Sequence, residues 1–206
     1  MGILITGASG NVGKYVAQEL IKLGEDVVVA GTDPMKLNKI FGDEVKAVEL
    51  DFTNHETFDA ALEDIDRMFL MRPPHLGNPE DLYPFIDAAD IGLAIATVLH
   101  DPGKHRNSAY TITGADALDY FEVAETISKL TGRKITYAKP GYLKYRNHYI
   151  KNRGLDKGYV NVTVALYFMT RMGTAEAVTD EFLKLTGKKP KTFEEFVREN
   201  IKEFKR

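Results

Sequence analysis

Short apolar runs alternate with segments of helical periodicity over the first third of the chain. Four such runs predict β-strands, at Gly2–Thr6, Asp26–Gly31, Val45–Asp51 and Arg67–Met71. Each is too short for a helix, and the second is rich in β-branched residues, as buried parallel strands are. Strands that alternate with helices at these spacings indicate right-handed βαβ units around a parallel sheet.

The helices between these strands have start and stop signals. Asn11–Gly24 places apolar residues at helical spacing and ends in a glycine suited to the C′ position. Asp33 precedes Pro34 as a candidate N-cap. Thr53–Glu56 has the spacing of a capping box. We therefore expect a helix after each of the first three strands.

The second half of the chain is mainly helical in pattern. We expect two further short strands, Tyr110–Gly114 and Lys134–Ala138, around a helix that runs from a cap at Asp119 to Gly132. Further helices are expected at Tyr142–Lys151, Tyr159–Met172, Thr179–Leu185 and Thr192–Phe204. The fold class is α/β: a shortened Rossmann-type doubly wound parallel sheet with a small, mainly helical C-terminal lobe. We expect one domain over residues 1–206, with the βα units in 1–100 and the C-terminal strand–helix portion and lobe in 101–206.

The segment Phe85–Gly103 has an unusual apolar pattern. At about 100° per residue, Leu82, Phe85, Ile86 and Ala89 lie on one side of a helix. Ile91, Ala94, Ile95, Val98 and Leu99 lie on nearly the opposite side. Either one helix is buried all round, or two helices are joined at Ala89–Asp90. We favour the second interpretation.

Composition and charge argue against several classes of function. The net charge of −3 and the pI of about 6.0 give no basic excess for nucleic acid, and the basic run Lys184–Lys191 is more typical of a solvated connection. The chain has no cysteine and five scattered histidines, so we expect no thiolate chemistry, disulfide or metal site. It begins in a strand and has no apolar run of membrane-spanning length, so we expect a cytoplasmic protein without a membrane partner.

A glycine loop lies between the first strand and the first helix. Its three glycines have the Gly-x-x-Gly-x-x-Gly spacing that permits a tight turn, close approach of a pyrophosphate and close helix–strand packing. The N–H groups at the start of the helix then attract phosphate. A glycine-rich turn without a ligand is the weaker alternative. We therefore predict dinucleotide binding by Gly7, Ser9, Gly10, Asn11, Val12 and Gly13.

Other cofactor contacts are expected where the next strands end. Asp33 could bind the ribose hydroxyls, although capping of the helix is the stronger interpretation. Asp51 and Phe52 would flank the adenine. Met71, Arg72 and Pro73 would line the path to the nicotinamide, with a surface ion pair as an equal alternative for Arg72. The choice between NAD and NADP stays open at this point.

Several segments together resemble one family. They are TGASGNVG at Thr6–Gly13, LDF at Leu50–Phe52, FLMRPP at Phe69–Pro74, the segment Tyr110–Tyr137 and TFEEF at Thr192–Phe196. The chain resembles the NmrA-like atypical short-chain dehydrogenases/reductases, which include members similar to NAD(P)H:quinone oxidoreductases. The resemblance implies a Rossmann domain that binds NADP or NAD and a smaller lobe that closes over a substrate. It also implies either hydride transfer to a quinone-like acceptor or, in regulator-like members, nucleotide sensing without turnover.

The sequence departs from this family in three ways. The family commonly has an arginine for the 2′-phosphate of NADP at the position of Thr32, where here only Thr32 and Lys36 could serve; the resemblance still leans slightly to NADP. No tyrosine has a lysine four residues later, so the Tyr-x-x-x-Lys acid–base pair is absent and the catalytic residues stay unknown. A central segment on the order of 80 residues, two βα units with their connections, is missing between Ala89 and Asp90.

Two functions from different classes follow. The first is an NAD(P)H-dependent oxidoreductase acting on quinone-like or similar small electrophiles, and the second is a non-catalytic NAD(P)-sensing regulator. The missing segment would leave the fourth strand as a bare sheet edge. We expect Tyr110–Gly114 to pair with that edge, or two chains to meet there as a homodimer.

A polar-aromatic cluster is expected in the lobe. Tyr142, Tyr145, His148 and Tyr149 would lie on one helix and could face the nicotinamide. Ordinary amphipathic packing of that helix is the stronger interpretation.

Overall fold

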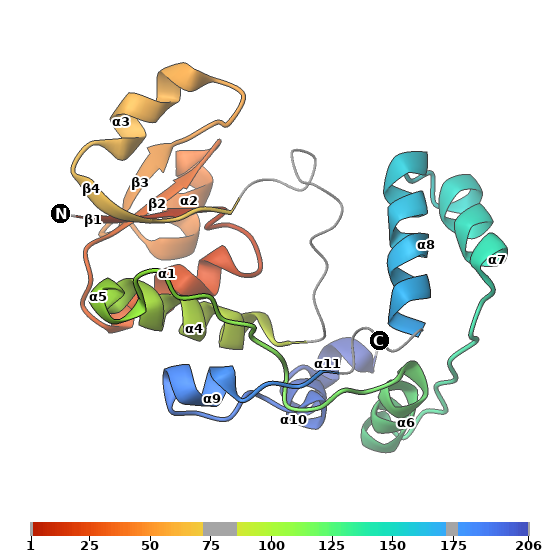
Figure 1. Ribbon diagram of the computed structural model, residues 1–206. Helices are drawn as coiled ribbons and strands as arrows, with labels where there is room; N and C mark the ends of the chain where they lie inside the picture. Colours follow the sequence, from red (N-terminus) through yellow and green to blue (C-terminus); the bar gives the residue numbers. More distant parts are fainter. Residues whose placement is uncertain (1, 72–85, 172–176, 206) are drawn as a thin grey trace. The chain divides into compact units, whose positions relative to one another are not determined.

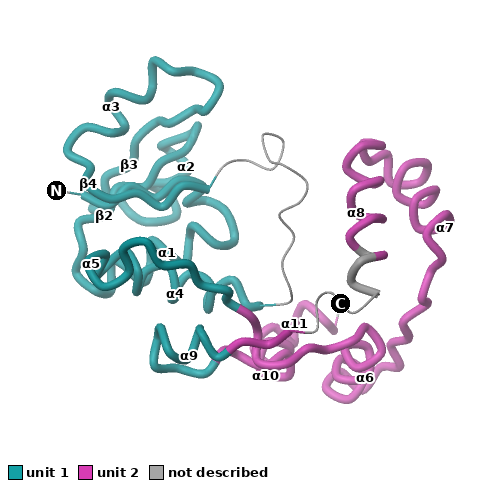
Figure 2. The backbone as a smooth tube through the Cα atoms, viewed as in Figure 1, with its two compact units in different colours: residues 1–77, 86–112, 180–189 teal, residues 78–85, 113–179, 190–206 magenta. Residues whose placement is uncertain are grey.

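The computed structural model describes residues 2–71, 86–171 and 177–205, which form two compact units (Figures 1 and 2). Unit 1 comprises residues 1–77, 86–112 and 180–189, and unit 2 comprises residues 78–85, 113–179 and 190–206. The described part of unit 1 contains the sheet, whereas the described part of unit 2 contains helices and connecting segments.

Unit 1 is a parallel sheet with helices on both faces (Figure 1). Its elements are β1 (Gly2–Thr6), α1 (Gly13–Lys22), β2 (Val27–Gly31), α2 (Pro34–Phe41), β3 (Lys46–Glu49), the 3₁₀ turn η1 (His55–Thr57), α3 (Phe58–Leu62), β4 (Ile65–Phe69), α4 (Ala88–His100), α5 (Pro102–His105) and α9 (Glu181–Thr186). The strand order is β3-β2-β1-β4, and every pairing is parallel. The Rossmann-type α/β fold predicted from the sequence is therefore confirmed.

The two faces of the sheet follow from the alternation of side chains along each strand. On one face, Ile3 and Ile5 pack with Val16 and Leu20 of α1 and with Ala96 of α4. On the other face, the cluster consists of Leu4, Val28, Ala30, Leu50 and Ala61, the last from α3. Because both faces are covered, β1 and β2 are apolar along nearly their whole length, as the sequence pattern indicated.

Helix α4 explains the change of apolar face in the segment Phe85–Gly103. The helix begins at Ala88, where the Asp87 carboxylate accepts a hydrogen bond of 2.9 Å from the N–H of Ala89. Ile86 precedes the helix, and Leu82 and Phe85 lie outside the described residues. A helix that ends near Ala89 would include Ile86 and Asp87. That expectation is wrong, because Asp87 is the N-cap of a helix that begins at Ala88. A single helix continues through Ala89–Asp90.

Gly92 allows α4 to lie directly on α1. A Cβ atom at Gly92 would be 2.5 Å from Cβ of Tyr15, 2.9 Å from its carbonyl carbon and 3.0 Å from the nitrogen of Val16. The C-terminal end of α4 is held to the sheet, since Arg67 of β4 donates a hydrogen bond of 2.5 Å to the carbonyl of Leu99. These contacts fix α4 against α1 and β4.

Two expected strands are absent from the structure. Tyr110–Gly114 is extended but pairs with no strand, and Glu181 accepts a hydrogen bond from the N–H of Thr111. Lys134–Ala138 is likewise not a strand, because Ser128 Oγ accepts from the N–H of Ile135 at 2.8 Å. In both segments a side-chain oxygen accepts the hydrogen bond of a backbone N–H that, in a strand, would donate to a neighbouring strand. The prediction that Tyr110–Gly114 pairs with β4 is wrong.

Unit 2 consists of helices around small apolar and aromatic clusters. Its elements are α6 (Tyr120–Thr131), α7 (Tyr142–Asn147), the π-helical turn η3 (His148–Asn152), α8 (Lys157–Arg171), α10 (Phe193–Glu199) and α11 (Ile201–Phe204). α6 packs with α10 and α11, and α7 packs with α8. The predicted helices are confirmed over their described residues, but the one expected at Tyr142–Lys151 is divided at His148 and the one expected at Thr192–Phe204 is divided at Asn200.

The helix caps show which local sequence signals predicted the start or end of a helix correctly. Asp119 and Thr192 form complete capping boxes, and Gly132 ends α6 with φ of 72°. The capping box predicted at Thr53–Glu56 is wrong, because Asn54 provides the cap and accepts from the N–H of Glu56 at 3.2 Å. Thr53 instead donates to Asp51 at 2.7 Å.

No helix among the described residues is long and apolar enough to cross a membrane. No group of three or more His, Asp or Glu side chains within the described ranges could hold a metal ion.

Candidate functional site

The glycine loop connects the end of β1 to the start of α1 in a tight turn. Gly7 has φ of 62°, a left-handed conformation that glycine adopts without strain. The N–H of Gly10 donates to the carbonyl of Gly7 at 2.9 Å and closes the turn. Ser9, Gly10 and Asn11 are exposed, so the backbone of the loop is open to a ligand.

Gly13 and Gly10 leave space that no other residue would leave. A Cβ at Gly13 would lie 2.4 Å from the carbonyl oxygen of Gly7 and 2.7 Å from its carbonyl carbon. A Cβ at Gly10 would lie 3.1 Å from the same oxygen. The close approach of α1 to β1 therefore requires glycine at residue 13, as the third glycine of a dinucleotide loop does.

The start of α1 has donors available for an anion. Val12 is the N-cap residue, and no side chain caps the helix. Among the described residues, no acceptor lies within hydrogen-bond reach of the N–H groups of Asn11, Val12 and Gly13. Unpaired N–H groups at the positive end of a helix dipole form a phosphate site. The loop thus fits the pyrophosphate of a dinucleotide.

Thr6 joins the loop to the end of β4. Its buried Oγ1 accepts from the N–H of Met71 at 2.6 Å and lies 3.0 Å from the carbonyl of Phe69. Met71 is thereby held beside Gly7, where a Cβ would be 3.7 Å from the Met71 Sδ. The structure brings the predicted Met71 to the loop. Sequence reasoning assigned no role to Thr6, although a polar residue ending a wholly buried apolar strand was a usable signal.

The residues after β2 begin α2. Asp33 caps the helix and accepts from the N–H of Lys36 at 3.1 Å. Thr32, Asp33 and Lys36 are all exposed. Capping by Asp33, the stronger interpretation from the sequence, is confirmed. A contact of these three residues with a ribose or a 2′-phosphate stays a prediction.

The residues after β3 form a compact turn. The Asp51 carboxylate accepts from the N–H of Thr53 at 2.8 Å and from its hydroxyl, while the N–H of Asp51 donates to Thr57 at 3.0 Å. Phe52 is half-buried and lies edge-on to Phe58, with 6.5 Å between the ring centres. Asp51 therefore orders the turn, and Phe52 presents an aromatic surface after the strand. Arg72 and Pro73 lie outside the described residues.

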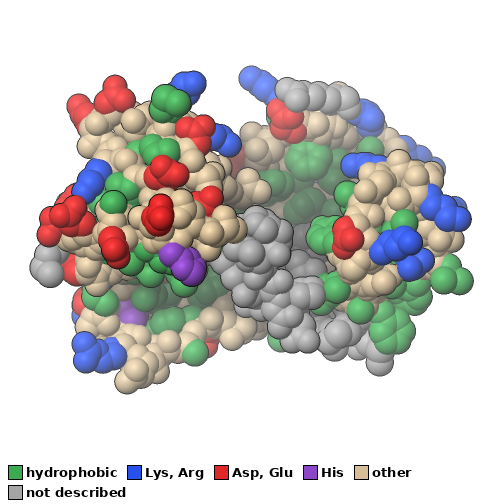
Figure 3. Space-filling view, turned by 90° about the horizontal axis from the view of Figure 1, so that it is seen from above, with side chains coloured by type: hydrophobic (Ala, Val, Ile, Leu, Met, Phe, Trp, Pro, Cys, Tyr) green, Lys and Arg blue, Asp and Glu red, His purple; other side chains and the backbone are tan. Residues whose placement is uncertain are grey.

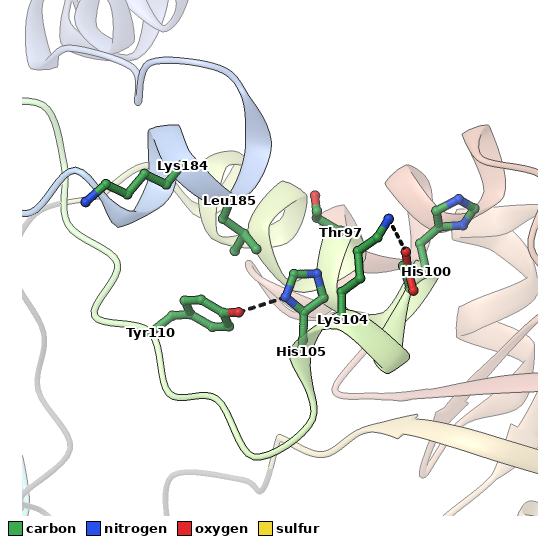
Figure 4. A pocket seen from close by; sticks show the side chains of 8 residues that line it. Thr97, His100, Lys104, His105, Tyr110, Lys184 and Leu185 are labelled. Atoms are coloured by element: carbon green, nitrogen blue, oxygen red, sulfur yellow. Dashed lines mark hydrogen bonds and ion pairs between the residues drawn. The ribbon is translucent and has the colours of Figure 1, made fainter.

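A cavity elsewhere in unit 1 does not involve these residues. It has a volume of about 650 Å³ and lies between α4, α5 and α9 (Figure 4). In it, His105 Nδ1 lies 2.8 Å from the hydroxyl of Tyr110, and Lys104 pairs with Asp101 at 2.6 Å. Lys184 pairs with Asp180 at 2.7 Å. Because Lys104 and Lys184 are each paired with a carboxylate, neither lysine of this cavity is left unpaired for an anion.

Ion pairs shift pKa values around this cavity. The hydrogen bond from Lys104 holds the pKa of Asp101 below its usual value and raises the pKa of Lys104. Lys184 and Asp180 act on one another in the same way. All four groups are therefore held charged at neutral pH.

Comparisons with known proteins identify the fold. Residues 3–73 match the NAD dependent epimerase/dehydratase family. The chain is 23% identical to the Prestalk A differentiation protein A of Dictyostelium discoideum over 281 aligned positions, which cover 98% of this chain and 93% of the relative. Since the chain has 206 residues, that alignment includes a long stretch of the relative without a counterpart here.

An enzyme and a solved structure are also similar. The chain is 31% identical to an NAD(P)H azoreductase of Xenophilus azovorans, over 58% of this chain and 41% of the azoreductase. The structure of an NADPH-dependent quinone oxidoreductase from Escherichia coli, in complex with NADPH, superposes with a TM-score of 0.82 at 16% identity and covers 97% of this chain and 99% of that chain. This likeness shows the fold.

Proposed function

We propose that the chain is an NAD(P)H-dependent oxidoreductase of quinone-like or similar small electrophiles, since residues 3–73 match the NAD dependent epimerase/dehydratase family and the fold is similar to that of an NADPH-dependent quinone oxidoreductase. The observation that carries the proposal is the loop itself. Gly13 allows close packing of α1 on β1, and three N–H groups at the start of that helix have no acceptor among the residues that the structure describes. The azoreductase similarity supports a reductase.

The residues of this chain would hold the dinucleotide in four places. The N–H groups of Asn11, Val12 and Gly13 would bind the pyrophosphate. Thr32, Asp33 and Lys36 would meet the adenosine ribose, and the exposed ammonium of Lys36 favours NADP slightly because it can pair with a 2′-phosphate. Phe52 would lie against the adenine, with Asp51 holding its turn. Met71, with Arg72 and Pro73, would lie toward the nicotinamide.

The bound dinucleotide would supply the hydride. The chain's own residues bind it, orient it and limit the access of water. The sequence has no Tyr-x-x-x-Lys pair to deliver a proton. A quinone-like acceptor suits such a site, since a reduced quinone takes its protons from water and needs no positioned acid.

Non-catalytic NAD(P) sensing is a second candidate. The described sheet has four strands, and the 281-position alignment leaves a long stretch of the relative unmatched. A shorter chain would keep the adenine half of the site, which comes from β1 to β4, and could lack part of the substrate wall. Binding would then report the redox state of the nucleotide without turnover.

The outer edge of β4 supports a homodimer. Within the described ranges β4 pairs only with β1, and Met68 and Leu70 near that edge are 41% and 59% exposed. An exposed apolar strand edge favours pairing with another chain. We expect a dimer by light scattering after size-exclusion chromatography, and a monomer at all concentrations would contradict this assembly.

Turnover measurements test the function. NADPH and NADH are each mixed with the protein and with benzoquinone, menadione or an azo dye, and loss of reduced-nicotinamide absorbance is followed. We expect NADPH oxidation by wild type and none by Gly13→Val. Nucleotide binding without oxidation of any acceptor would contradict the oxidoreductase and support the sensor, whereas no binding would contradict both.

A further inference from the structure

Unit 2 contains a cavity of its own, with a volume of about 360 Å³. Its walls are mainly aromatic, and two basic side chains, Lys144 and His148, also line it. The aromatic residues are Tyr120, Tyr137, Tyr142, Tyr145 and Tyr149. Pockets for small molecules have this size, about 300–1,000 Å³, and this composition, mostly apolar surface with a few polar groups.

The tyrosine rings are held in place by one another. Tyr120 and Tyr137 stack with 5.0 Å between ring centres. Tyr145 and Tyr149 are 4.4 Å apart with 35° between their planes, and His148 meets Tyr149 edge-on at 5.4 Å. Rings fixed in pairs present flat apolar faces at little entropic cost to a ligand. A planar ring system is the ligand shape that such walls accommodate best.

Helical spacing explains how one segment supplies so many of these groups. Lys144 and His148 are four residues apart, as are Tyr145 and Tyr149, so each pair lies on one side of α7 and its continuation. The continuation is the π-helical turn η3, in which the N–H of Arg153 donates to the carbonyl of His148 at 3.2 Å. Single π turns are rare and recur at functional sites. His148 and Tyr149, the first two residues of this turn, both line the cavity.

The segment that supplies most of the cavity lining is rich in basic residues. Residues 133–157 contain eight Lys or Arg residues and one Asp. Figure 3 shows Lys and Arg side chains among apolar ones on unit 2, the right-hand part of that view. Arg146 is bonded to Asn161 at 2.7 Å, whereas no carboxylate of the described residues lies within ion-pair distance of Lys144. An anionic group on the ligand would complement Lys144.

From this geometry we propose that the cavity binds a planar aromatic molecule with an anionic oxygen substituent. Its rings would lie against the tyrosine faces and its negative group would pair with Lys144. All the residues that line the site belong to unit 2, and the inference does not rest on the proposed reductase activity. Basic residues interspersed with tyrosines also suit single-stranded nucleic acid, but a small cavity fits one ring system better than an extended strand.

Calorimetric titration with anthraquinone-2-sulfonate tests the inference on the full chain. We expect one molecule bound per chain, no binding of cyclohexanesulfonate and weakening by added salt. Lys144→Gln and Tyr145→Leu should each weaken binding roughly tenfold. The matched variants Lys151→Gln and Tyr159→Leu, at exposed residues outside the cavity, should bind as wild type does.

Three results would overturn the inference, and each can be told apart from the others. Equal affinity in Lys144→Gln and its control Lys151→Gln would overturn the inference, and the exposure of Lys144 keeps this result independent of folding. Tighter binding of oligouridylate than of the probe would also overturn it. Gly13→Val should lose NADPH binding and keep the probe; loss of both would place the probe in the dinucleotide site and refute a second site.

Discussion

The contact between α4 and α1 in unit 1 leaves no space for a single added methyl group at Gly92. In Gly92→Ala, the new Cβ would stand 2.5 Å from Cβ of Tyr15 and 3.0 Å from the backbone nitrogen of Val16. Ordinary carbon contacts are about 3.5–4.0 Å, so the helices must separate by about 1 Å. The backbone atoms of α1 cannot rotate away, which places the cost at the upper end of overpacking, about 3 kcal/mol.

Alanine also favours a helix over glycine by about 1 kcal/mol, which leaves a net loss of about 2 kcal/mol. Urea unfolding followed by circular dichroism measures the free energy of unfolding. Gly103→Ala is the matched control, because its Cβ would meet nothing closer than 3.7 Å, and it should leave stability unchanged or slightly raised. A Gly92→Ala protein as stable as wild type would refute direct packing of α4 on α1.

Two further substitutions test other contacts. Thr6→Val removes the acceptor of the Met71 N–H and should lower the free energy of unfolding by about 1–3 kcal/mol; an unchanged urea midpoint would count against the link between β1 and the end of β4. Hydrogen bonds from the backbone and hydroxyl of Thr192 hold the pKa of Glu195 below its ordinary value of 4.5. A carboxyl group whose pKa is lower in the folded state than in the unfolded state contributes stability above its unfolded-state pKa. That stability is lost as the pH falls through the folded-state pKa. Wild type should therefore lose more stability on acidification than Glu195→Gln, and parallel pH profiles would contradict this.

The sequence was sufficient where the signals were local. The βαβ order of residues 2–69, the cap at Asp33 and the capping boxes at Asp119 and Thr192 depend on residues within a few positions of one another. The glycine loop belongs to the same class, because its spacing sets the turn and the packing of α1 together. Nearby residues alone determine such elements, so the sequence predicts them without knowledge of the tertiary structure.

Strand predictions failed where a partner was required. Tyr110–Gly114 has a suitable composition for a strand, but a strand exists only beside another strand. In this chain Glu181, distant in sequence, binds the N–H of Thr111, and Ser128 binds that of Ile135. These contacts depend on tertiary placement, which the local pattern does not contain.

The candidate site likewise contains some features that the sequence predicts and others that depend on tertiary packing. The proximity of Met71 to Gly7 follows from the rule that ligand-binding residues gather at the carboxyl ends of parallel strands. The role of Thr6 depends on the pairing of β1 with β4, and the role of Gly92 on the packing of α4. Neither follows from spacing alone.

The central claim is that the glycine loop binds a nicotinamide dinucleotide, and calorimetric titration of NADPH into the full chain tests it most directly. Wild type and Gly103→Ala should bind one NADPH per chain with equal affinity. Gly13→Ala should bind at least about tenfold more weakly, because its Cβ would lie 2.4 Å from the carbonyl oxygen of Gly7 and would force the loop to shift. No binding of NADPH or NADH by wild type, or equal affinity in Gly13→Ala, would contradict the account.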